Sequence, residues 1–312
     1  MTIEASAAVR RALAEARALV ALESTLICHG MPKPENLALA LDLERAVRTA
    51  GATPATVGVL DGRIKAGLDP GELARLAAAD EVAKCSTRDL PYVVAKGRLG
   101  ATTVAATLFV ACRLGIQIMA TGGLGGVHLG GESSMDVSAD LEELARSQVI
   151  VVCSGVKSIL DQRRTLERLE SLGVPVIGFR CAELPGFYTA ESGLPIPEVD
   201  DHGQLRRLVE THLALGLPGG MVVVQPPPSE HALARAEVAR LVEEARRAAE
   251  MTDIRGPAQT PFMLRHMAQT SEGATVRVNH ALALANARLA ADLAVALAHE
   301  PGRGDGTAPQ RA

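Results

Sequence analysis

The sequence predicts an α/β protein with three layers, α/β/α, in which a mixed, mostly parallel central sheet carries a helical C-terminal addition. Short apolar runs alternate with longer segments of helical period through most of the chain, which is typical of a sheet covered by helices on both faces. Asp61-Gly62 between two apolar runs indicates a hairpin, so the sheet is expected to be mixed. From Ser229 onward the pattern is helical.

The predicted elements follow this alternation along the chain. The first residues form an amphipathic pattern interrupted by Glu4, Glu15 and arginines, which indicates a helix and not a signal peptide. The apolar runs predict strands at residues 19–26, 56–60, 116–121, 149–153, 174–179 and 220–225. The helical periods predict helices at residues 35–49, 70–79, 102–114, 139–146, 159–172, 204–215 and 230–250.

The last part of the chain predicts a long Ala-rich helix at residues 276–299, followed by a disordered tail at residues 300–312. No linker rich in Pro, Gly or Ser divides the sequence, and it contains no internal repeat. We therefore expect one domain over residues 1–299.

Composition excludes several classes of function. The 312 residues include 32 basic and 36 acidic side chains, two Tyr, four Phe and no Trp, so the chain offers neither a basic groove nor stacking rings for nucleic acid. No run approaches the length of a membrane span. The five cysteines are scattered and form no CxxC pair, which favours reduced thiols in the cytoplasm.

The densest unusual segment is ATGGLGGVHLGGESSMDVSADLEELA, residues 120–145. It matches neither a P-loop nor a dinucleotide fingerprint, so it is either a structural loop or a ligand site. Its position after a predicted strand favours a ligand site, because open α/β sheets bind ligands at that edge. Asp136 and Asp140 flank Ser138 in it; they are either capping and first-turn acids, or a Mg²⁺ or Mn²⁺ ligand and a carboxylate that handles water or substrate hydroxyls.

Lys157 is a candidate nucleophile. It follows the strand that ends at Ser154-Gly155 and stands at the expected turn into a helix, whose N-terminal amides disfavour a charged lysine. Such an amine can attack a carbonyl, although a solvated lysine at a helix start has the same local sequence.

Four further residues are candidates with ordinary alternatives. Glu23 ends an apolar strand and either points into a cleft or lies exposed at an edge. Lys84 precedes a loop and could be a surface residue. His29 and His128 could exchange protons, although a lone histidine is more often structural.

Taken together, these segments resemble the pseudouridine-5′-phosphate glycosidase family. The resemblance covers roughly residues 15 to 295 and rests on ALESTLICHGMPKPEN, KCSTRDLP, KGRLGATTVAAT, ATGGLGGVH, MDVSADLEEL, VVCSGVKSILD, GVPVIGFR and TPFMLRHMAQTSEG. Each motif is weak alone, and their order along one chain makes them specific. The family implies an α/β/α domain, a homotrimer and a divalent metal, Mn²⁺ in the first place and Mg²⁺ in the second.

The resemblance also implies roles for individual residues. Lys157 matches the covalent lysine, Glu23 the proton donor and Asp136 the metal ligand. The implied substrate contacts are Lys84, Val104, His128, Ser138, Ala139, Asp140 and Asn279.

The implied activity is reversible cleavage of the C–C glycosidic bond between ribose 5-phosphate and uracil through a lysine imine. Leu129 stands where uracil-cleaving members often carry Arg, and Met135 where they commonly carry an aromatic residue. The alternatives are therefore a C-glycosynthase that joins ribose 5-phosphate to another carbon nucleophile, and a catalytically silent sugar-phosphate-binding protein. With so few rings in the chain, we expect a nucleotide base to be held mainly by backbone and polar groups of the glycine-rich loop.

Overall fold

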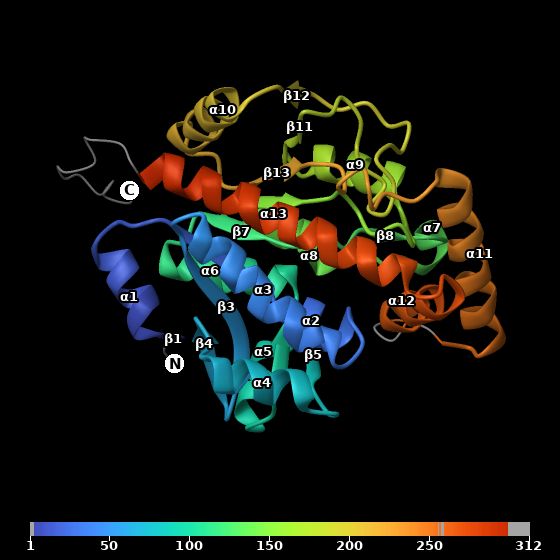
Figure 1. Ribbon diagram of the computed structural model, residues 1–312, viewed down its shortest axis with the longest axis horizontal. Helices are drawn as coiled ribbons and strands as arrows, with labels where there is room; N and C mark the ends of the chain where they lie inside the picture. The colour runs from blue at the N-terminus through green and yellow to red at the C-terminus, as the bar shows by residue number, and fades with distance from the viewer. Residues whose placement is uncertain (1–2, 255, 257–258, 299–312) are drawn as a thin grey trace.

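The computed structural model describes residues 3–254, 256 and 259–298 (Figure 1). Its centre is an 11-stranded sheet with the order β1-β4-β3-β2-β7-β9-β13-β11-β12, in which β5 pairs with β6 and β6 with β3. These strands are β1 Glu4–Ala5, β2 Leu19–Leu22, β3 Thr53–Leu60, β4 Arg63–Ala66, β5 Ala83–Cys85, β6 Gly100–Thr102, β7 Ile118–Ala120, β9 Ile150–Cys153, β11 Val176–Phe179, β12 Glu198–Val199 and β13 Met221–Val224. A small separate sheet joins β8 Val127–His128 to β10 Leu160–Asp161.

Helices cover both sides of this sheet. They are α1 Ala7–Ala14, α2 Thr25–His29, α3 Glu35–Thr49, α4 Pro70–Ala78, α5 Leu90–Ala95, α6 Val104–Leu114, α7 Gly131–Ser134, α8 Ala139–Leu144, α9 Gln162–Ser171, α10 His202–Ala214, α11 Arg235–Met251, α12 Gln259–Thr270 and α13 Ala274–Ala298. In Figure 1, α3 and α13 lie side by side in front of the sheet, and α6 and α8 pack together behind it.

The predicted fold class is confirmed. Strand β3 pairs antiparallel with β4 and β6, and the remaining pairs of the large sheet are parallel. Because the parallel strands point the same way, the carboxyl ends of β2, β7, β9 and β13 meet at one edge. The core between the layers is aliphatic, with Val151, Val152 and Leu108 fully buried.

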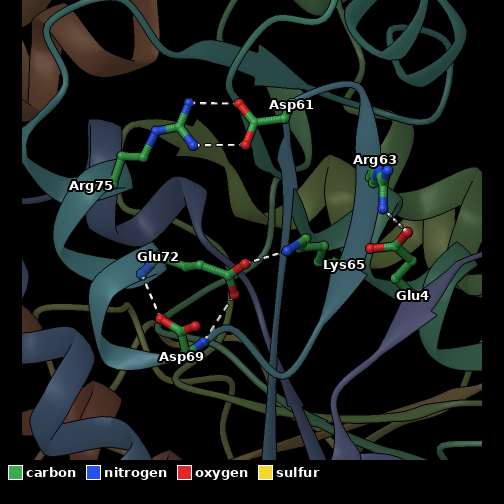
Figure 2. A network of polar contacts seen from close by, with 7 residues as sticks. All are labelled: Glu4, Asp61, Arg63, Lys65, Asp69, Glu72 and Arg75. Atoms are coloured by element: carbon green, nitrogen blue, oxygen red, sulfur yellow. Dashed lines mark hydrogen bonds and ion pairs between the residues drawn. The ribbon is translucent and has the colours of Figure 1, made fainter.

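The hairpin predicted at Asp61-Gly62 joins β3 to β4, and an exposed charge network surrounds it (Figure 2). Arg75 of α4 donates two hydrogen bonds to the Asp61 carboxylate, at 2.8 and 2.6 Å. Lys65 pairs with Glu72, and Arg63 pairs with Glu4 across β4 and β1. Ion pairs in contact with solvent contribute little to stability, so this network orients the hairpin more than it stabilises the fold.

Several predicted boundaries differ from the structure, and three of the differences have a clear local reason. The first strand ends at Leu22, not at residue 26, because the buried Ser24 hydroxyl donates to the Val57 carbonyl at 2.6 Å and α2 begins directly after it. Residues 159–161 include β10, so α9 begins at Gln162. Helix α11 begins at Arg235 because the His231 and Ala232 amides first close a turn on the Pro228 carbonyl, at 2.9 and 3.1 Å.

The long carboxyl-terminal helix exists as α13, which begins at Ala274. Residue 299 and the predicted tail at 300–312 lie outside the described residues. Helix α13 is long and apolar enough to cross a membrane by length and composition alone, and 56% of its most apolar window is buried inside the protein. It packs on β2, β7 and β9, and a core helix of this kind passes the same test.

Candidate active site

A cavity of about 690 Å³ opens at the edge where the parallel strands end. Every site residue selected from the sequence lines it, although the residues come from distant parts of the chain. They are Glu23, Lys84, Val104, His128, Asp136, Ser138, Ala139, Asp140, Lys157 and Asn279. The structure thus brings the residues together, and their chemical roles stay predictions.

Glu23 directly follows β2 and is buried, with 6% of its surface exposed. Its Oε1 accepts a hydrogen bond from the hydroxyl of Thr121, which directly follows β7. Burial raises the pKa of Glu23 above its ordinary value, and the nearby positive charge of Lys157 opposes that rise less strongly. A carboxyl group with a raised pKa keeps its proton to higher pH, which suits a proton donor.

Lys157 lies in a loop and not at a helix start. Since α9 begins at Gln162, the expectation that its N-terminal amides flank Lys157 is wrong. The backbone N–H of Lys157 donates to the Leu124 carbonyl at 3.1 Å, and its Nζ donates to the Gly123 carbonyl at 2.5 Å. The lysine is therefore held against the glycine-rich loop, with its amine at the cavity wall.

Lys84 is not the surface residue that its local sequence allowed. It belongs to β5, opposite Ala101 of β6, and its side chain lines the cavity. Burial lowers the pKa of Lys84, and the positive charge of Lys157 lowers it further. Two lysines whose charges repel each other, beside a buried carboxyl group, form a site suited to an anionic substrate.

Asp140 fixes the loop and two helix ends around the cavity. Its Oδ1 accepts the Ala105 amide of α6 and its Oδ2 accepts the Gly125 amide, both at 2.9 Å. The Ser138 hydroxyl accepts the Asp140 amide at 3.3 Å and caps α8. A Cβ at Gly125 would lie 2.2 Å from the Ser138 Oγ, so this glycine is required by close approach of the backbone to neighbouring side chains.

His128 and Asp136 lie opposite each other where the two ends of the segment between them meet. The His128 amide donates to the Asp136 carbonyl at 3.0 Å, and His128 Nδ1 lies 3.8 Å from Asp136 Oδ2. Burial lowers the pKa of His128, and the Asp136 carboxylate partly opposes this.

Asp136 is suited to bind a hard cation that has few protein ligands. Its carboxylate lines the cavity, and no group of three or more His, Cys, Asp or Glu side chains in the described part of the chain could hold a metal ion. One carboxylate supplemented by water and substrate oxygens is an arrangement that Mg²⁺ and Mn²⁺ accept, whereas a zinc site needs more protein ligands.

Several cavity residues were not predicted from the sequence. Thr121 supports Glu23, and Ser86 and Thr260 line the walls. Phe187 also lines the cavity, so its wall includes one aromatic ring beside the backbone and polar groups expected to hold a base. Phe187 is 2% exposed and packs edge-on against Tyr188. No periodic pattern marked it, because it lies in an irregular loop.

The side chains of His29 and Asn279 also make contacts within the protein. His29 Nε2 bonds to the Val82 carbonyl at 3.1 Å, and His29 also lines the cavity. Asn279 of α13 is 3% exposed, and its Nδ2 donates to Met31 Sδ at 3.7 Å.

The fold and the cavity together define an α/β enzyme whose site lies at the carboxyl edge of a mixed sheet. The chain belongs to the family described as indigoidine synthase A like protein, whose model matches residues 8–296.

Relatives and solved structures cover nearly the whole chain. The pseudouridine-5′-phosphate glycosidase of Caldanaerobacter subterraneus subsp. tengcongensis is 49% identical over 296 residues, covering 95% of this chain and 96% of the relative. The enzyme of the same name from Paracoccus denitrificans is 50% identical over 291 residues, covering 92% and 96%.

Two crystal structures share the fold. The prealnumycin C-glycosynthase AlnA in complex with ribulose 5-phosphate superposes with a TM-score of 0.87 at 38% identity, covering 96% of this chain and 97% of that chain. An indigoidine synthase A-like protein from Thermotoga maritima gives a TM-score of 0.86 at 34% identity, with the same coverage.

Proposed function

We propose that this chain is a pseudouridine-5′-phosphate glycosidase, which reversibly cleaves the C–C glycosidic bond between ribose 5-phosphate and uracil. One observation supports it most directly: Glu23, Lys84 and Lys157 line the same cavity, with Glu23 and Lys157 close enough to perturb each other. Identity near 50% to glycosidases of that name over most of the chain supports the same function.

The chemistry explains the residue types. The departing atom of uracil is carbon, so protonation of a leaving oxygen, as in an ordinary glycosidase, cannot break the bond. Glu23 supplies the proton that opens the ribose ring, and the Lys157 amine attacks C1′ to form a covalent adduct. Uracil then leaves as a carbon acid, taking a proton at C5, and water releases ribose 5-phosphate from the lysine imine.

The remaining wall residues bind and orient the substrate. Lys84 supplies positive charge to the sugar phosphate, and polar backbone groups come from Val104 at the start of α6 and from Ser138 and Ala139 at the start of α8. Asp136 would hold Mn²⁺ or Mg²⁺; a metal there would orient water and substrate oxygens.

A second candidate is a C-glycosynthase that joins ribose 5-phosphate to another carbon nucleophile. The 38% identity to AlnA favours it, as does the apolar side chain of Met135, which lines the cavity and is 86% exposed. Both enzymes use the same lysine chemistry and differ in the acceptor.

Incubation with ribose 5-phosphate and a panel of acidic carbon nucleophiles distinguishes the candidates. Efficient coupling to uracil supports the glycosidase, and coupling to other acceptors with none to uracil supports the glycosynthase. Binding of pseudouridine 5′-phosphate without release of uracil would instead indicate a catalytically silent binding protein.

We also propose a cytoplasmic homotrimer that binds neither nucleic acid nor membrane. The family resemblance supports the trimer, the net charge of -4 argues against nucleic-acid binding, and the cysteines, all free, suit a reducing compartment. Light scattering on the purified protein would measure the oligomeric state.

A further inference from the structure

Asn286 is a fully buried amide on the apolar side of α13, with 0% of its surface exposed. Most buried residues of this helix are Ala, Leu and Val. A buried amide is costly unless its donors and acceptor are paired, so its contacts show what it does.

The side chain of Asn286 joins the carboxyl ends of three neighbouring strands. Its Nδ2 donates to the Thr121 carbonyl at 2.9 Å, directly after β7. Its Oδ1 accepts from Gln225 Nε2 at 3.0 Å, directly after β13. The Ser154 hydroxyl, directly after β9, lies 3.1 Å from Nδ2 and 3.3 Å from Oδ1.

These strand ends carry the chemical groups of the cavity. Thr121 donates its hydroxyl hydrogen bond to Glu23. Gly123, two residues further along, accepts the Lys157 amine, and Ser154 begins the short segment that leads to Lys157. Asn286 is not among the described residues that line the cavity, so it acts through its neighbours.

We propose that Asn286 is a positioning residue that holds the ends of β7 and β9 in register and thereby places Lys157 and Glu23 for reaction. This inference rests on the proposed function. The amide suits the task because it donates to one strand end and accepts from another at the same time, which neither a carboxylate nor an aliphatic side chain of that size can do.

Asn286→Asp and Asn286→Leu test the proposal. Asp keeps the shape but places an acceptor against the Thr121 carbonyl, and Leu removes all the hydrogen bonds. We measure the rate of borohydride trapping with saturating ribose 5-phosphate and divide it by the fraction of protein molecules that can be trapped at all, which we call the competent sites. We expect this rate to fall about 10- to 100-fold, because a small misplacement of the reacting groups has an effect of that size. We expect kcat to fall in parallel and KM to stay within about threefold.

A merely structural role would reduce the fraction of trap-competent protein and leave the rate per competent site unchanged. Thr275→Val is the matched control, because Thr275 is also buried on α13 but contacts Ser271 and the Tyr188 side chain instead of a strand end. It should lower the melting temperature and leave the trapping rate alone.

Gln225→Met removes the hydrogen bond that Gln225 Nε2 donates to Asn286 Oδ1, with little change in volume. It keeps the proposal testable if neither Asn286 variant folds. We expect it to slow trapping about threefold or more. A folded Asn286 variant with wild-type trapping rate overturns the inference, as does an unchanged rate in Gln225→Met when the others do not fold. Absence of trapping in the wild-type protein would refute the proposed function itself, whereas equal rates in wild type and variants refute only the positioning role.

Discussion

The Nζ of Lys157 donates a 2.5 Å hydrogen bond to the carbonyl oxygen of Gly123. This contact ties the proposed nucleophile to the glycine-rich loop, and the Lys157 backbone amide bonds to Leu124 of the same loop at 3.1 Å. The loop therefore lines the ligand site and also sets the position of the reactive amine.

Lys157→Ala is expected to abolish turnover and leave the fold intact. Loss of a covalent nucleophile costs about 10⁴-fold or more in kcat. Borohydride with ribose 5-phosphate should add mass to Lys157 in the wild-type protein, as peptide mass spectrometry would show. Lys96→Ala, at an exposed position, is the control and should behave as wild type. Trapping on a different lysine would refute the assignment.

Glu23→Gln is expected to lower kcat by about 10²- to 10⁴-fold, the usual contribution of general acid–base catalysis. The exposed Glu35→Gln is its control and should retain activity. A Glu23→Gln protein that opens the ribose ring and turns over at the wild-type rate would show that another group donates the proton.

The raised pKa of Glu23 makes a separate prediction about stability. Because the folded-state pKa lies above the ordinary 4.5, burial of neutral Glu23 stabilises the protein below pH 4.5 relative to higher pH. This stability is lost as pH rises through the raised pKa. Glu23→Gln removes the titrating group. The melting temperature of this variant should therefore rise relative to that of the wild-type protein as pH increases. A difference in melting temperature that does not change with pH would contradict burial as the dominant cause.

Asp136→Ala is expected to lose activity that added Mn²⁺ does not restore. Calorimetric titration of the unliganded protein with Mn²⁺ gives a second readout, in which the variant should bind more weakly than wild type. Asp80→Ala, which removes only an exposed partner of Lys33, is the control. Unchanged Mn²⁺ binding in Asp136→Ala would place the metal elsewhere.

Gly125→Ala is expected to destabilise the protein by about 1–3 kcal/mol, the usual cost of overpacking. The new Cβ would lie 2.7 Å from Asp140 Oδ2, and so would displace the carboxylate that holds α6 to the loop. Chemical denaturation measures this change. Gly71→Ala lies at an exposed position of α4, where the nearest atom is Asp69 Oδ1 at 3.2 Å, and should cost little. Equal stability of both variants would argue against close packing at Gly125.

The alternation of apolar runs and helical periods was sufficient to predict the layers of this fold, because each element has to bury one face whatever its neighbours are. Helix α3 was predicted with its exact bounds, and the hairpin at Asp61-Gly62 has its predicted pairing. Strand β2 was predicted too long, because a short apolar run such as LESTLI fits a buried strand and a buried helix equally well.

The sequence by itself determined the fold class and the candidate residues, since these follow from local patterns and from motifs that occur together in one chain. Only the tertiary structure decided that Thr121 supports Glu23, that Phe187 lines the cavity and that Asn286 joins the strand ends. Each of these relationships connects residues far apart in the chain. Their physical cause is the packing of α13 and of irregular loops against the sheet edge, and no local pattern of residues encodes that packing.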